Sequence, residues 1–114
     1  MKILNRKEFL KLQTAVVYSE YESYCFRGLM IKFPCIEPSD FYNDWYLDNI
    51  IGEVENNSSE DFTDKCDRME RGESLPMDFE ATDRDGCFNT DDKLFAIYEK
   101  DDIKKLIRRL KKLL

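Results

Sequence analysis

Hydrophobic positions along this chain come in short clusters separated by polar stretches, and their spacing predicts both helices and strands. A first helix is expected to begin after Asn5, which can cap it, with Glu8 three residues later to complete a capping box. A second is expected over residues 59–71, where acids occupy the first turn and arginines the last, as the helix dipole favours. A third is expected over residues 102–113, where apolar side chains recur at the spacing of one helical face.

Segments rich in β-branched and aromatic residues predict the strands. These segments are residues 15–18, 24–33, 75–81 and 93–99. Residues 40–51 are ambiguous, because Phe41 and Trp45 have the spacing of a helical face while the aromatic density is equally typical of a strand. We favour the strand there.

The order of these elements predicts a small α+β fold. Helices and strands follow one another as α-β-β-β-α-β-β-α, with no repeat or linker, so residues 1–114 are expected to form a single domain. We expect an antiparallel sheet of four to five strands packed with two to three helices. The helix over 59–71 has a narrow apolar stripe of Phe62, Cys66 and Met69 and should therefore lie on the surface of that sheet.

Charge is strongly segregated along the chain. The 114 residues include 24 carboxylates and 18 Lys and Arg, a formal net charge of -6. Residues 1–13 carry four bases against one acid (+3) and residues 100–114 carry seven bases against two acids (+5). The segment between them has 7 bases and 21 acids (-14). The basic ends therefore either neutralise the acidic middle on folding or leave it exposed to a partner.

Several classes of protein are excluded by what the sequence lacks. Its 0 histidines exclude Ser-His-Asp and Cys-His catalysis, His-ligated zinc and an imidazole pH switch. No apolar stretch follows the basic N-terminus, so no signal peptide is expected, and no apolar run is long enough to span a membrane. Four cysteines form no C-x-x-C pair: Cys25, Cys35, Cys66 and Cys87. We expect reduced, mostly buried thiols in a cytoplasmic protein.

The loop predicted over residues 82–92 is the nearest approach to a metal site. It offers the oxygen-bearing side chains that Ca²⁺ prefers, Asp83, Asp85, Asn89 and Asp91. The EF-hand pattern fails, because Gly86 falls at the fourth position and Leu94 stands at the twelfth, where a glutamate is needed. A solvated turn explains the segment better, and we expect no metal and no cofactor.

Catalytic arrangements are no better supported. Paired carboxylates serve as acid and base in glycosidases, but among 24 acids some pair is always close and no pattern marks one as buried. Cysteine nucleophiles would lack a histidine partner, and the four glycines are isolated, so there is no phosphate-binding loop. We expect no enzyme activity, with a cryptic carboxylate enzyme as an alternative.

Two charged surfaces are candidates for binding. The terminal helix has lysines and arginines opposite its leucine stripe, which is typical of a core-packing helix or of one that binds phosphates, an anionic membrane or an acidic partner. We favour core packing, and the acidic body argues against direct nucleic-acid binding. An acidic surface, if it does more than keep the chain soluble, can occupy a basic nucleic-acid groove of a partner protein. Its candidate partner-binding residues are Glu60, Asp64, Asp67, Asp83, Asp85, Asp91 and Asp92.

The N-terminal third of the chain resembles small accessory proteins of tailed phages and prophages. The segments that carry the resemblance are MKILNRKEFLKL (residues 1–12), VYSEYE (17–22) and GLMIK (28–32). The resemblance transfers no functional residue and implies a context, in which small acidic phage proteins inhibit host or defence proteins, as anti-CRISPR factors do. We therefore expect a non-enzymatic inhibitor of such a protein in the bacterial cytoplasm. The alternative is a small-ligand binder that sequesters a nucleotide signal, which would need the two basic ends to converge on a pocket.

Overall fold

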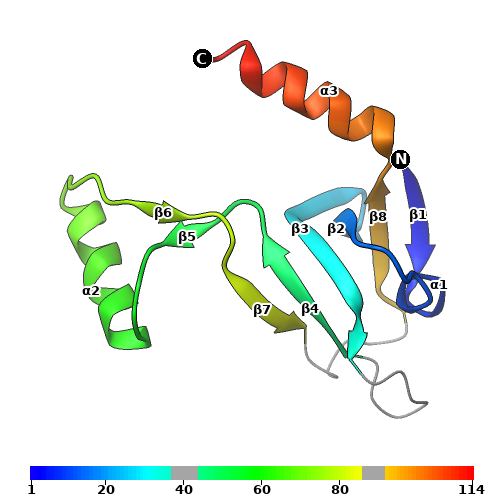
Figure 1. Ribbon diagram of the computed structural model, residues 1–114, viewed down its shortest axis with the longest axis horizontal. Coiled ribbons are helices and arrows are strands. Elements are labelled where there is room, and N and C mark those ends of the chain that lie inside the picture. The colour runs from blue at the N-terminus through cyan, green and yellow to red at the C-terminus, as the bar shows by residue number, and fades with distance from the viewer. Residues whose placement is uncertain (37–43, 86–91) are drawn as a thin grey trace.

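The structure is a computed structural model that describes residues 1–36, 44–85 and 92–114, with the side chains of residues 35, 36, 44, 84 and 85 left undescribed (Figure 1). Its helices are α1 (Arg6–Leu10), α2 (Ser59–Glu70) and α3 (Lys100–Lys111). Its strands are β1 (Lys2–Asn5), β2 (Val16–Glu22), β3 (Cys25–Ile36), β4 (Asp44–Asn49), β5 (Glu53–Val54), β6 (Met77–Asp78), β7 (Thr82–Asp85) and β8 (Leu94–Tyr98). The α+β class is confirmed.

The main sheet is antiparallel and has the order β1-β8-β2-β3-β4-β7, so it contains six strands where four to five were expected. The sequence patterns missed two edge strands. β1 lies immediately before α1, and β7 lies within the predicted loop over 82–92. Both have only four residues, and they become strands because each has a neighbour to pair with, which periodicity within one segment does not reveal. β4 confirms the strand favoured for residues 40–51 over the part that the structure describes.

Aromatic side chains form the core on one face of this sheet. Phe9 of α1 stacks on Phe95 of β8 with ring centroids 3.9 Å apart and an interplanar angle of 4°. The rings of Tyr18 and Trp45 meet Phe9 edge-on at 4.8 and 5.1 Å. All four side chains are fully buried. Trp45 Nε1 donates a hydrogen bond of 3.2 Å to Tyr18 Oη, so the polar atoms of the cluster are paired inside it.

A lysine is buried beside these rings. Lys32 has no exposed surface, and its Nζ donates hydrogen bonds to the carbonyl oxygens of Leu12 (3.0 Å) and Phe33 (3.1 Å). The same Nζ lies 5.5 Å from the centroid of the Phe9 ring, within cation–π range. Burial of this ammonium is offset by these contacts, which also tie the segment after α1 to β3.

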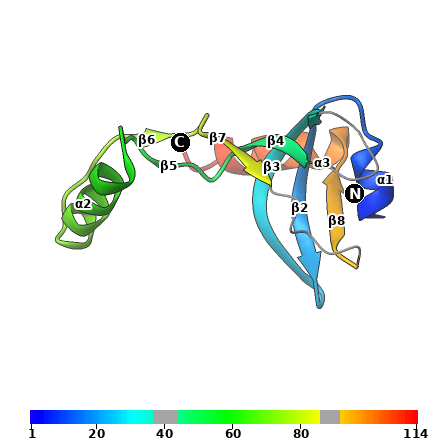
Figure 2. The same ribbon diagram turned by 90° about the horizontal axis from the view of Figure 1, so that it is seen from below.

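An arm, defined as residues 53–78, leaves the sheet between β4 and β7. It consists of α2 and of β5 paired with β6, which we call the ribbon. The expectation that α2 lies on the main sheet was wrong: α2 contacts β5, and Figures 1 and 2 show it at the end of the molecule away from β8. Its narrow apolar stripe is partly covered by the ribbon, where Val54 is buried. The radius of gyration is accordingly 16.1 Å, against about 13 Å for a compact chain of this length.

The expectation that α3 packs on the core was also wrong. None of its residues is buried, and it contacts β8 near the point where it begins. It begins at Lys100, two residues before the predicted start, because Glu99 and Asp102 form a capping box. Among the helices that the structure describes, none is long and apolar enough to cross a membrane. Of the two cysteines whose side chains are described, both free, Cys25 is exposed and Cys66 half-buried, so burial was wrongly expected for Cys25.

We expect Phe9→Ala to lower the free energy of unfolding by about 3–5 kcal/mol, because it opens a cavity between Phe95, Tyr18 and Trp45. Phe62→Ala, on the arm and 37 % exposed, is the control and should cost about 1 kcal/mol. Urea denaturation followed by tryptophan fluorescence measures both. Equal losses for the two variants would contradict the assignment of the core to the Phe9 cluster.

Candidate functional site

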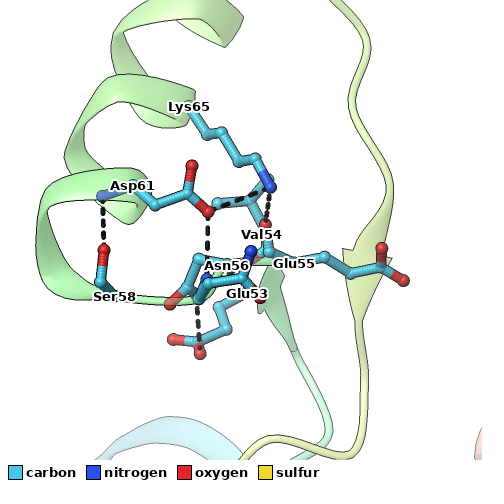
Figure 3. A network of polar contacts seen from close by, with 8 residues as sticks. Glu53, Val54, Glu55, Asn56, Ser58, Asp61 and Lys65 are labelled. Carbon is cyan, nitrogen blue, oxygen red and sulfur yellow. Dashed lines mark hydrogen bonds and ion pairs between the residues drawn. The ribbon is translucent and has the colours of Figure 1, made fainter.

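Hydrogen bonds and an ion pair hold the acidic helix α2 in place within the arm (Figure 3). Ser58 caps the helix in extended conformation, and its Oγ accepts a hydrogen bond of 3.1 Å from the Asp61 N–H. Asp61 Oδ2 in turn accepts a hydrogen bond of 3.0 Å from the backbone N–H of Asn57. The first turn is therefore joined to the loop before it by two reciprocal bonds.

Asp61 and Lys65 connect the helix to the ribbon. Lys65 Nζ lies 3.2 Å from Asp61 Oδ2, one turn away, and donates a hydrogen bond of 2.7 Å to the carbonyl oxygen of Glu55 (Figure 3). The Asn57 N–H, and after it Lys65, hold the pKa of Asp61 below its ordinary value. Asn56 Nδ2 donates a hydrogen bond of 2.9 Å to the carbonyl oxygen of Val54, and this bond fixes the turn between the ribbon and α2. The direction of α2 is thus set by polar contacts more than by burial.

The C-terminal end of α2 is also closed. The N–H of Gly72 donates to the Met69 carbonyl (3.0 Å) and the N–H of Glu73 to the Arg68 carbonyl (3.1 Å), the paired bonds of a Schellman motif. The motif needs a left-handed residue, and Gly72 supplies it with φ at 100°. Arg68 Nη2 pairs with Glu73 Oε2 at 2.8 Å, and this contact raises the pKa of the arginine.

Three of the predicted partner-binding residues are brought together by α2. Glu60, Asp64 and Asp67 occupy positions i, i+4 and i+7, so they share one side of the helix, and all three are exposed. Asp61, Lys65 and Arg68 are occupied in the contacts that hold the arm. The carboxylates that hold α2 in place within the arm and those that face solvent are therefore different residues.

The remaining predicted residues lie elsewhere. Asp83 is exposed on β7 and Asp92 is exposed just before β8, both in or beside the main sheet and away from α2 (Figure 1). Asp85 ends β7, paired in register with Trp45, but its side chain lies outside the described residues. Asp91 also lies outside them, as does most of the predicted loop. The described acids thus form an arm group and a separate sheet group.

Two described carboxyl groups take part in ion pairs that shift their pKa values. The two whose pKa departs from the ordinary value are Asp61 and Asp102, and both are lowered. For Asp102 the main cause is a hydrogen bond from the Met1 ammonium, 2.6 Å away. Neither supplies a proton donor at neutral pH, which a carboxylate acid catalyst requires. Within residues 1–34, 45–83 and 92–114, no three Cys, Asp or Glu side chains are grouped to hold a metal ion.

The exposure of α3 was missed by sequence reasoning. The amphipathic pattern was visible, but it does not tell which helices find a partner within the fold. Open surface hollows of about 410 and 340 Å³ run along α3 and are lined by its own residues, among them Lys105, Arg108 and Arg109 in the larger. No residue of the basic N-terminal segment lines either of these two hollows, so they do not provide the pocket between both ends that the nucleotide-binding alternative needs.

We expect Asp61→Asn to weaken α2 alone, with its amides opening about two- to threefold more often. Because the folded pKa of Asp61 is lowered, its stabilisation is complete above the ordinary value of 3.8 and is lost as the pH falls through the lowered value. Wild-type α2 should therefore lose helicity in that window while Asp61→Asn changes less, as measured by backbone chemical shifts. Asp64→Asn, one turn away, is the control. An identical pH response in wild type and Asp61→Asn would refute this role.

The function of this chain has to follow from these surfaces. Comparison with protein-family models, with curated proteins and with solved structures gives no match.

Proposed function

We propose that this chain is a non-enzymatic binding protein that inhibits a protein partner by placing the carboxylates of the arm in a basic groove. The observation that carries the proposal is the exposed row of Glu60, Asp64 and Asp67 on a helix with no buried residue, held away from the sheet by the contacts of Figure 3. Arg71 follows these acids at the C-terminal end of the same side, so the side carries three exposed carboxylates against one cation and is suited to a partner of the opposite, basic sign.

The spacing of these carboxylates supports a groove that otherwise holds nucleic acid. With a rise of 1.5 Å per residue, the three charges extend over about 10 Å along α2. One strand of duplex DNA carries a phosphate about every 3.4 Å along its axis, so it presents four charges over the same length. Lysines and arginines placed for that strand therefore meet a similar charge density on α2. An occupied groove excludes nucleic acid, and this exclusion is the proposed inhibition.

The caps at both ends of α2 support binding through this surface. The Ser58 cap, the Asp61–Lys65 pair and the Gly72 motif fix the helix before any partner arrives. Little conformational entropy is then lost when the carboxylates bind, and that loss is one of the main costs of association. Long-range attraction adds a fast association rate that falls steeply with salt.

The resemblance of the N-terminal third to phage accessory proteins supports the choice of partner. The partner class we propose is a host or defence protein with a basic nucleic-acid-binding groove, of the kind that anti-CRISPR and other anti-defence proteins inhibit, in the cytoplasm of a bacterial host.

We expect immobilised wild-type protein to capture such a partner from a bacterial host lysate and to release it when duplex DNA is added, since DNA competes for the same groove. Glu60→Lys/Asp64→Lys/Asp67→Lys should reduce capture at least about tenfold, because each charge is reversed where it meets the groove. Binding should also be lost by about 0.5 M salt, where the Debye length is under about 5 Å. Quantitative mass spectrometry of the captured proteins is the measurement.

The matched control is Glu22→Lys/Asp92→Lys/Asp101→Lys, which makes the same charge change at exposed acids outside the arm. It should retain capture. An equal loss in both triple variants would show that net charge, and not the arm, governs binding, and capture that persists above 0.5 M salt would refute the electrostatic basis of the proposal.

A further inference from the structure

The apolar side of α3 is left without a partner in the fold. Ile107 is 46 % exposed, Leu110 is 56 % exposed and Leu113, just beyond the helix, is 72 % exposed. Ile103 and Leu106, nearer to β8, are half-buried. These apolar residues have the spacing of a helical face that normally packs on a core. Here the first turns of the face lie near the sheet and the later turns are exposed to solvent, where α3 extends away from β8 (Figure 1).

The surface area of the chain indicates that more than this stripe is available for burial. The accessible surface is 8462 Å², whereas a compact monomer of 13.6 kDa exposes roughly 6,600 Å². The difference is about 1,900 Å², and a standard protein interface removes about 800 Å² from each partner. The surface exposed beyond that of a compact monomer is therefore larger than the area that one partner buries in a standard interface.

A second set of exposed apolar residues lies where the ribbon joins the main sheet, one of them in β6 and two just outside the arm. Ile51 and Phe79 are 59 % and 58 % exposed, and Met77 is 38 % exposed. Gly52 leaves room for the Phe79 ring, because a Cβ at position 52 would stand 2.8 Å from it. Four carboxylates lie in or next to the two strands: Glu53 and Asp78 pair with each other on the face opposite to Met77, and Glu55 and Glu80 follow them in the chain.

The two patches are complementary in charge. The exposed stripe of α3 is flanked by cations, and the hollow beside Ile107 is walled by Lys104 and Arg108. The ribbon and the residues beside it carry four carboxylates, against the one cation Lys65 that contacts the ribbon at the Glu55 carbonyl. Within one copy, α3 contacts β8 while the ribbon contacts α2, and Figure 1 shows α3 and the ribbon on separate parts of the molecule.

We propose that α3 of one copy packs its apolar stripe onto the ribbon of a second copy, and that the same contact repeated by two-fold symmetry makes a homodimer. Each copy donates one helix and accepts one, so the contact closes without leaving a free patch. The outward carboxylates of α2 belong to neither surface, and the dimer consequently presents two acidic arms. This inference does not depend on the proposed function.

An anionic membrane is the competing occupant of α3, and the charges disfavour it. Residues 1–99 carry 11 bases and 22 acids, a net -11, which an anionic surface repels. α3 also has no aromatic residue of the kind that anchors interfacial helices. A second copy, by contrast, supplies both the apolar area and the opposite charge.

The first experiment is sedimentation equilibrium of the full chain from 5 to about 200 µM in 0.1 M salt. Wild type should reach the mass of two 13.6 kDa copies. Leu110→Glu and Phe79→Ser, one on each patch, should each remain at one copy across this range, with at least about a hundredfold weaker association. Both positions are exposed, so circular dichroism should show both variants folded. A wild-type monomer at every concentration overturns the proposal.

The second experiment tests the pairing of the two patches. Arg108→Glu/Arg109→Glu places acids against the acidic ribbon, and Glu53→Lys/Glu80→Lys places bases against basic α3, so each variant alone should be monomeric. An equimolar mixture should form a heterodimer, because both contacts are then of opposite charge. Dimers of the ribbon variant alone would indicate α3–α3 pairing and overturn the proposal. Wild-type monomers that bind phosphatidylserine vesicles would also overturn it, in favour of the membrane.

Discussion

The stack of Phe9 on Phe95 is the contact on which the rest of the structure depends. A helix of five residues is too short to be stable by itself, so α1 exists because its capping box starts it and because Phe9 is buried against the sheet. Large aromatic side chains make up for the small contact area of so short a helix. Tyr18 of β2 and Trp45 of β4 both contact the Phe9 ring. One short helix can then bury aromatic side chains that come from three strands of the six-stranded sheet.

Concentrating the apolar residues in this cluster leaves little for the arm and for α3. The arm is held instead by caps, by the Asp61–Lys65 pair and by the ladder of the ribbon, and neither α2 nor α3 contains a buried residue. Elements of this kind leave most of their surface exposed, and exposed segments are the parts of a protein that most often bind partners. The buried residues therefore lie mainly in the sheet and α1, whereas the arm and α3 expose most of their surface.

The segregation of charge along the chain persists in space. The N-terminal ammonium is paired with Glu99 and Asp102 at 3.0 and 2.6 Å, so that end does neutralise acids, but they are those at the start of α3. The cations farther along α3 lie apart from α2 and its acids (Figure 1). Acidic and basic surfaces thus coexist on one small molecule. This arrangement underlies both proposals, an acidic arm for a basic groove and a basic helix for the acidic ribbon of another copy.

The sequence alone determined the features that depend on a few neighbouring residues. The Asn5 cap, the three helices, the α+β class, the strand in 44–49 and the exposed acids of α2 were all predictable, because caps and periodicity act over a few residues. The edge strands β1 and β7 were not, since their pairing depends on β8 and β4. Nor were the arm and the free stripe of α3. An amphipathic pattern records that a face is suited to burial, and only the competition among all elements for one core decides which faces are covered.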